Sequence, residues 1–118
     1  MVGSEKKSIE WATLALIALC YGGWVLSSLL WLTSFWWLAP PLMTVLAAFH
    51  GSLQHETVHG HPTPWQAANE VLVSLPLGVI FPYRRYRDLH LRHHNDANLT
   101  DPFEDPESYF WPLSHYRA

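Results

Sequence analysis

The stretch WATLALIALCYGGWVLSSLLWL, residues 11–32, decides the fold, because it is apolar along its length and carries no charged side chain. As a helix it would extend about 33 Å, which matches the roughly 30 Å hydrocarbon core of a bilayer. The uncharged block continues to residue 55, so all seven Lys/Arg and all ten Asp/Glu residues lie outside it. Such a block excludes an ordinary soluble globular domain and a disordered chain. We therefore expect an all-α integral membrane protein.

A second apolar stretch, residues 35–54, follows after the short polar break Thr33-Ser34. The pair Pro40-Pro41 stands near its start, where the missing N–H donors cost a helix least. Tryptophans typical of an aromatic belt at one membrane interface cluster around the break: Trp31, Trp36 and Trp37. The two stretches predict a transmembrane helical hairpin. A cleaved signal peptide is the alternative for the first stretch, but its apolar run is longer than a typical signal core and a second run follows at once.

The positive charges predict the orientation of this hairpin. They lie before its first helix and after its second, and none lies at its tip: Lys6, Lys7, Arg84, Arg85, Arg87, Arg92 and Arg117. By the positive-inside rule, both ends of a multi-pass protein then face the cytoplasm. The compact loops fit a bacterial inner membrane. A net charge of −3 without a free basic arm argues against nucleic acid as a partner.

A third apolar run, residues 71–82, is too short to cross a bilayer and contains Pro76, Gly78 and Pro82. We expect it to lie in the membrane interface or to form a buried connector. From Tyr83 the sequence YRRYRDLHLRHH pairs arginines with aromatics, as a helix at the headgroup level would. The segment from Asn95, rich in Asp, Glu and Pro, predicts a loop.

Five of the eight histidines fall into two spacings that suit metal ligands. His55 and His59 are four residues apart at the cytoplasmic end of the second apolar stretch. His90, His93 and His94 follow the pattern H-x-x-H-H, so on a helix each group lies on one face. Neutral imidazoles favour zinc, iron, copper or nickel over magnesium or calcium. The other histidines are interpreted as interfacial or hydrogen-bonded residues: His50, His61 and His115.

The first histidine group has an alternative interpretation. The run HETVH also satisfies H-E-x-x-H, in which Glu56 would activate a zinc-bound water between the ligands His55 and His59. That pattern indicates a membrane zinc metalloprotease, but it leaves the H-x-x-H-H group unexplained. A third hypothesis is a truncated or non-catalytic membrane hairpin whose histidines only bind metal.

The run HETVH from His55, a gap of thirty residues with an interrupted apolar stretch, and the run HLRHH from His90 together resemble the membrane fatty acid desaturases. Related hydroxylases and carotenoid ketolases share this superfamily. The resemblance implies an O₂-dependent enzyme with two non-haem iron ions that introduces a double bond into an acyl chain. It also implies a fatty acyl substrate, membrane lipids and an electron donor such as a ferredoxin or a cytochrome b5-type protein as partners. The implied iron ligands are His55, His59, His90, His93 and His94.

The family pattern continues with a third histidine box, another H-x-x-H-H, after two further spans, and the 118 residues do not contain it. We therefore expect residues 1–118 to be the N-terminal part of a single desaturase-like domain that is incomplete as a catalyst by itself. Carboxylates could orient the ligand imidazoles, and three near the histidine boxes are candidates: Glu56, Asp96 and Asp101.

Overall fold

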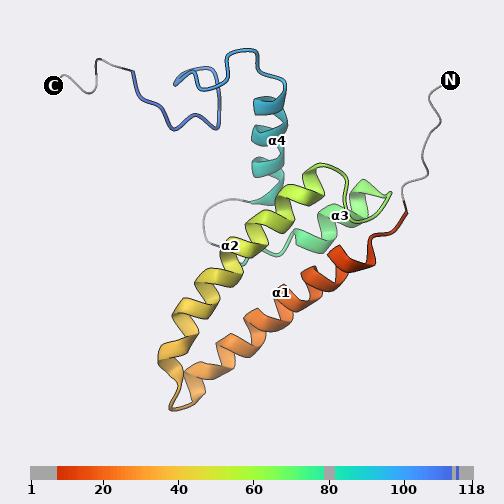
Figure 1. Ribbon diagram of the computed structural model, residues 1–118, viewed down its shortest axis with the longest axis vertical. Coiled ribbons are helices and arrows are strands. Elements are labelled where there is room, and N and C mark those ends of the chain that lie inside the picture. The colour runs from red at the N-terminus through yellow and green to blue at the C-terminus, as the bar shows by residue number, and fades with distance from the viewer. Residues whose placement is uncertain (1–7, 79–81, 113, 115–118) are drawn as a thin grey trace. The chain divides into compact units, whose positions relative to one another are not determined.

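The structure, a computed structural model, describes residues 8–78, 82–112 and 114. Within these ranges the regular elements are all helical, as expected (Figure 1). The chain divides into two compact units, Met1–Tyr83 and Arg84–Ala118. The first holds α1, α2 and α3, and the second holds α4 apart from its first residue, followed by an irregular segment.

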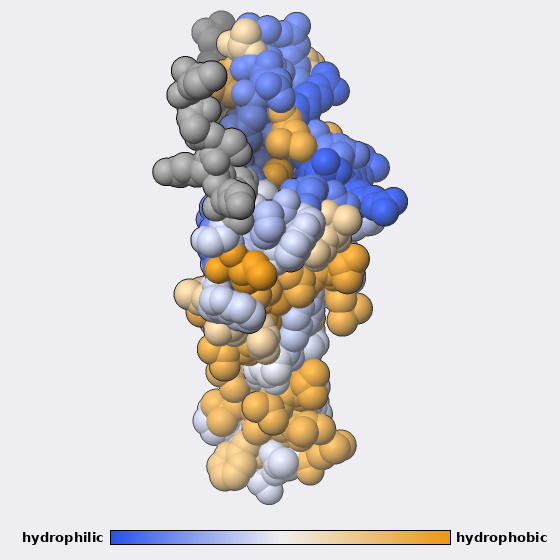
Figure 2. Space-filling view, turned by 90° about the vertical axis from the view of Figure 1, so that its right-hand side faces the viewer, coloured by the Kyte–Doolittle hydropathy of each residue, from blue (hydrophilic) through white to orange (hydrophobic). Residues whose placement is uncertain are grey.

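Helix α1 spans Trp11–Leu29 and continues as the short 3-10 helix η1, Leu30–Leu32. Together they form the one helix of the described residues that is long and apolar enough to cross a membrane. Figure 2 shows hydrophobic side chains covering the hairpin near its tip. Large apolar side chains of α1 are exposed: Leu16, Leu19, Val25, Leu26 and Leu29. Exposure of this kind suits a lipid environment, in which apolar surface needs no protein cover.

Helix α2, Ala39–Val58, packs antiparallel against α1, so the two helices form a hairpin (Figure 1). The connection includes a second 3-10 helix, η2, Trp36–Leu38. The helix begins and ends four residues later than the predicted stretch 35–54, because the proline pair lies in its first turn and the helix continues past His55. The polar residues near its C-terminal end make α2 less apolar than α1, and a second crossing stays a prediction.

Polar side chains in the hairpin hold the chain that follows α3, Gln66–Val73. The Tyr21 hydroxyl donates to the Leu75 carbonyl (2.9 Å), and so the His50 Nε2–H, 2.9 Å away, donates to the Tyr21 oxygen. Gln54 Nε2 donates to the Val73 carbonyl (3.2 Å). Backbone carbonyls at the end of α3 are thus satisfied by both hairpin helices, and the interpretation of His50 as a hydrogen-bonded residue is confirmed.

The turn after α2 is organised by the fully buried Asn69 of α3. Its Oδ1 accepts from the Thr63 N–H (2.9 Å) and hydroxyl (2.7 Å), while its Nδ2 donates to the Thr63 carbonyl (2.9 Å). His61 lies in the same turn with Nδ1 2.5 Å from the Glu10 carboxylate, so it too is hydrogen-bonded as expected. These contacts attach the turn both to α3 and to the start of α1.

The predicted apolar segment 71–82 is only partly helical. Its first residues complete α3, residues 74–78 are irregular, and residues 79–81 lie outside the described ranges. Helix α4 then spans Tyr83–His94, which confirms the helix expected for YRRYRDLHLRHH. The predicted loop from Asn95 is confirmed, since the described residues from 95 to 112 form turns and irregular chain.

Candidate metal centre

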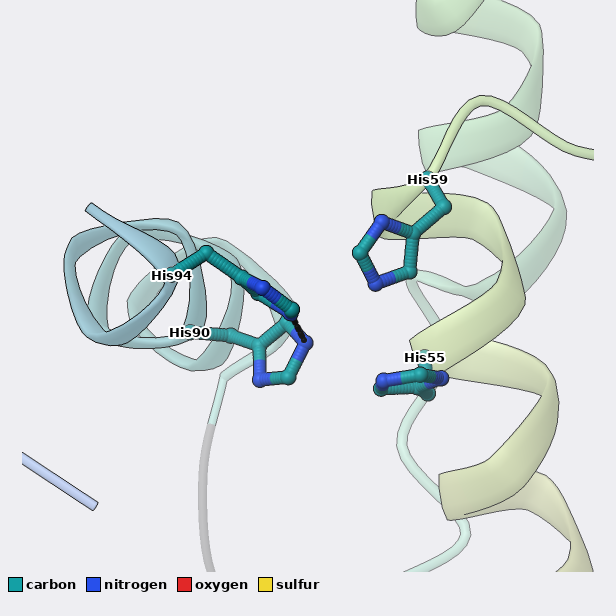
Figure 3. Close-up of side chains that lie close together, drawn as sticks. All are labelled: His55, His59, His90 and His94. Carbon is teal, nitrogen blue, oxygen red and sulfur yellow. Dashed lines mark hydrogen bonds between the residues drawn. The ribbon is translucent and has the colours of Figure 1, made fainter. Parts of the chain in front are cut away.

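The first histidine pair lies at the C-terminal end of α2. His55 occupies the last turn and His59 is the C-cap residue, and their ring centroids are 4.8 Å apart. Figure 3 shows both rings projecting from the same side of the helix. His55 is half-buried and His59 is exposed. The spacing of four residues therefore places two imidazoles on one face, as predicted.

The second group occupies the last turns of α4. His90 is buried, His93 is half-buried and His94 is exposed. The Nε2 atoms of His90 and His94 lie 3.0 Å apart, joined by the dashed line in Figure 3. The ring centroid of His93 is 6.2 Å from that of His90 and 5.8 Å from that of His94. The H-x-x-H-H spacing thus brings three imidazoles together at the end of one helix.

Two carboxylates from the segment after α4 contact these histidines. Asp105 Oδ1 lies 2.7 Å from His93 Nδ1, and the Glu107 carboxylate oxygens lie 3.0 and 3.2 Å from His90 Nδ1. An ionised carboxylate accepts hydrogen bonds only, so the imidazole Nδ1–H is the donor in both contacts. A neutral ring in this tautomer keeps the lone pair on Nε2, which can then bind a metal.

Asp105 is fixed by the backbone around it. The Thr100 N–H donates to Oδ2 and the Glu107 N–H donates to Oδ1, each over 2.9 Å. Thr100 adopts a left-handed conformation (φ 71°), which is uncommon for a β-branched residue and aims its N–H at the carboxylate. With only 2 % of its side chain exposed, Asp105 has no room to turn away from His93.

The same contacts shift the acidities of the pair. The hydrogen bond from His93 to Asp105 raises the pKa of this imidazole. Burial alone would raise the pKa of Asp105, but the backbone N–H groups of Thr100 and Glu107, together with His93, lower it to about 2. Asp105 is therefore ionised at physiological pH and remains an acceptor for the ring.

The donor set fits a transition metal. Two nitrogens bound at right angles to one metal, at about 2.1 Å each, lie about 3 Å apart. The two Nε2 atoms of His90 and His94 have this separation. Each of four histidines offers a nitrogen donor that could bind a metal ion: His55 and His59 in the first unit, and His90 and His94 in the second. His93 is not among these four, and its role as a ligand stays a prediction.

The carboxylates that orient the α4 histidines were not the ones expected from the sequence. Asp96 accepts from the Asn98 N–H, and Asp101 accepts from the N–H groups of Phe103 and Glu104, so both shape the loop itself. Glu56 is an exposed residue of α2. The repeated Asp-Pro of DPFEDPE, residues 101–107, is the sequence signal that marks this turn, but it does not show which carboxylate faces a histidine.

Comparison with known proteins adds one finding. Residues 31–118 match the family model described as fatty acid desaturase. The match includes both histidine groups, α4 and the loop that carries Asp105 and Glu107. No curated protein and no solved structure matches the chain.

Proposed function

The chain belongs to the fatty acid desaturase family, and from this premise we propose that it forms part of an O₂-dependent di-iron enzyme that introduces a double bond into the acyl chain of a lipid. The observation that carries the proposal is the family match over residues 31–118, which contains two histidine groups with the spacings that metal ligation requires. Hydroxylation of the same kind of substrate is the nearest variant.

The proposed iron ligands are His55 and His59 from α2 with His90, His93 and His94 from α4. Imidazole nitrogen suits iron, and four of these histidines offer donors that could hold a metal. Iron bound there would supply the O₂ activation that removal of hydrogen from an unactivated C–H bond requires, which side chains alone cannot supply. Further ligands would come from a third H-x-x-H-H box, as the family pattern implies.

The rest of the chain would place these ligands near a lipid. Helix α1 is a candidate membrane span, and an acyl substrate partitions into the same hydrocarbon that would surround it. We propose that α2 crosses the bilayer as well, so that both chain ends and both histidine groups face the cytoplasm. A ferredoxin or a cytochrome b5-type protein could then deliver electrons to the metals from that side.

The metalloprotease interpretation of HETVH has less support. Both interpretations use His55 and His59 as ligands, but only the desaturase family accounts for the H-x-x-H-H group on α4. The family match therefore favours iron and O₂ over zinc and peptide hydrolysis.

The test is lipid analysis in a host that lacks the corresponding unsaturated acyl chains. Expression of the intact protein should produce acyl chains lighter by two hydrogens, detected by mass spectrometry. His94→Ala should abolish this product, because it removes a ligand from the end of α4. His115→Ala should retain the product; His115 lies outside the described residues and is a control chosen from the sequence. Full activity of the His94→Ala protein would overturn the ligand assignment.

A further inference from the structure

The loop after α4 contains two carboxylates that each reach the Nδ1 atom of one histidine. Asp105 lies 2.7 Å from His93 Nδ1, and Glu107 lies 3.0 Å from His90 Nδ1. These residues follow the histidines by 12 and 17 positions, so the loop must fold back onto its own helix to make the contacts. All four residues belong to the same compact unit, Arg84–Ala118.

We propose that Asp105 and Glu107 are positioning residues that hold His93 and His90 in the Nδ1–H tautomer and thereby present the Nε2 atom of each ring to a metal. The inference rests on the proposed function, since the metal is the one the family implies. Carboxylates that accept from the outer nitrogen of a ligand imidazole fix its orientation and increase its basicity. The structure thus assigns a role to two acidic residues outside the histidine boxes.

The contact between His90 and His94 is compatible with this tautomer. If the His90 Nδ1–H donates to Glu107, its Nε2 carries a lone pair. His94 Nε2–H can then donate to that lone pair across the 3.0 Å that separates the two atoms. With the His90 proton on Nδ1 and its ring neutral, His94 donates to His90 and His90 donates to Glu107.

Asp105 is held more rigidly than Glu107. Both Asp105 oxygens accept backbone N–H groups, and 2 % of its side chain is exposed. Glu107 has 29 % of its side chain exposed, and its carboxylate accepts from His90. Loss of the Asp105 charge therefore risks disturbing the loop. Glu107→Gln instead removes the charge that selects the His90 Nδ1–H form, because an amide can both donate and accept, and it removes no acceptor of a backbone N–H. Comparison of the two substitutions therefore distinguishes an effect on the orientation of a histidine ring from an effect on the folding of the loop.

The first experiment measures the tautomers directly in metal-free protein. The chain is labelled with ¹⁵N and placed in detergent micelles, and spectra are recorded over a pH series so that the neutral form of each ring is compared. Long-range ¹H–¹⁵N spectra should show His90 and His93 as Nδ1–H. In Glu107→Gln the His90 signals should move toward a mixture with the Nε2–H form, and in Asp105→Asn the His93 signals should do so. Glu104→Gln is the matched control, because it removes one charge from the same loop while Glu104 contacts Asn98 instead.

The second experiment measures affinity with Co²⁺ as the probe metal. Glu107→Gln and Asp105→Asn should each weaken Co²⁺ binding by about 10- to 100-fold, and Glu104→Gln should change it by less than about 2-fold. Amide shifts of loop residues report whether each variant keeps its fold. Tautomers and affinity that stay unchanged in a folded Glu107→Gln protein would overturn the inference. If Co²⁺ binding is still lost in His94→Ala, the proposed ligands stand even though the positioning role fails. Absence of Co²⁺ binding by the intact wild-type protein would overturn both.

Discussion

The packing of α1 against α2 depends on a close approach at Gly23. A Cβ added at this position would lie 3.3 Å from both Cδ atoms of Leu46, which is tighter than an ordinary van der Waals contact. A Cβ added at the neighbouring Gly22 would meet nothing within 4 Å. Small residues at helix interfaces allow this approach in membranes, where packing rather than the hydrophobic effect drives association. Substitutions at the two glycines should therefore differ in their effect on the free energy of unfolding.

The magnitudes follow from helix propensity and overpacking. Replacement of glycine by valine in a helix gains about 0.3–0.5 kcal/mol, so Gly22→Val should be neutral or slightly stabilising. Gly23→Val gains the same amount but forces Leu46 aside, and overpacking of this kind costs about 1–3 kcal/mol. The two variants should therefore differ by at least about 1 kcal/mol in the free energy of unfolding.

The assay is unfolding of the protein in mixed micelles by titration with SDS, followed by tryptophan fluorescence. A matched set isolates the contact: Gly22→Val, Gly23→Val, Leu46→Ala and the double variant Gly23→Val/Leu46→Ala. Because Leu46→Ala removes the two Cδ atoms, the double variant should recover most of the loss caused by Gly23→Val. Equal stability of Gly22→Val and Gly23→Val would refute the proposed packing, as would a double variant in which the two losses simply add.

Three further predictions concern hydrogen bonds and pH. Asn69→Ala leaves the buried N–H and carbonyl of Thr63 without partners and should lower the free energy of unfolding by about 1–3 kcal/mol for each group in the same titration; an unchanged midpoint would contradict this. Tyr21→Phe removes the hydroxyl that links His50 to the chain after α3 and should cost about 1–3 kcal/mol, whereas an Ala15→Ser change on the exposed face of α1 should have little effect. The pKa of the Asp105 carboxyl group is lowered from 3.8 to about 2, so its stabilisation of the loop is complete above pH 3.8 and is lost as the pH falls toward 2. Hydrogen exchange of the loop amides should show this loss. Protection that is already lost at about pH 5 would contradict the prediction.

The sequence predicted the helices where apolar runs and prolines leave few choices. The uncharged run from Trp11 forms α1 almost to its predicted end, and α4 matches the run from Tyr83. The end of the helix in the second apolar run was harder to predict, because the hydropathy of the sequence decreases before the helix ends. The backbone of α2 continues through polar residues such as Gln54 and His55, whose side chains find partners on the protein.

The histidine groups were predictable, but the residues that orient them were not. The spacings i, i+3 and i+4 fix which imidazoles share a helix face whatever surrounds them. The partner of His93 depends instead on how the loop turns, and that turn requires a left-handed Thr100 and two backbone N–H groups directed at Asp105. A threonine gives no sequence signal for such a conformation. The burial of Asn69 was missed for a similar reason, since its partner Thr63 lies in an irregular turn.

The metal content of the purified protein tests the central claim most directly. The intact protein, isolated from iron-replete membranes and measured by elemental analysis, should contain iron in a ratio of two ions per chain, as the family pattern implies. His94→Ala should lose most of that iron while remaining in the membrane fraction. A wild-type protein that contains one zinc ion and no iron would contradict the account, and so would a His94→Ala protein that keeps its full iron content.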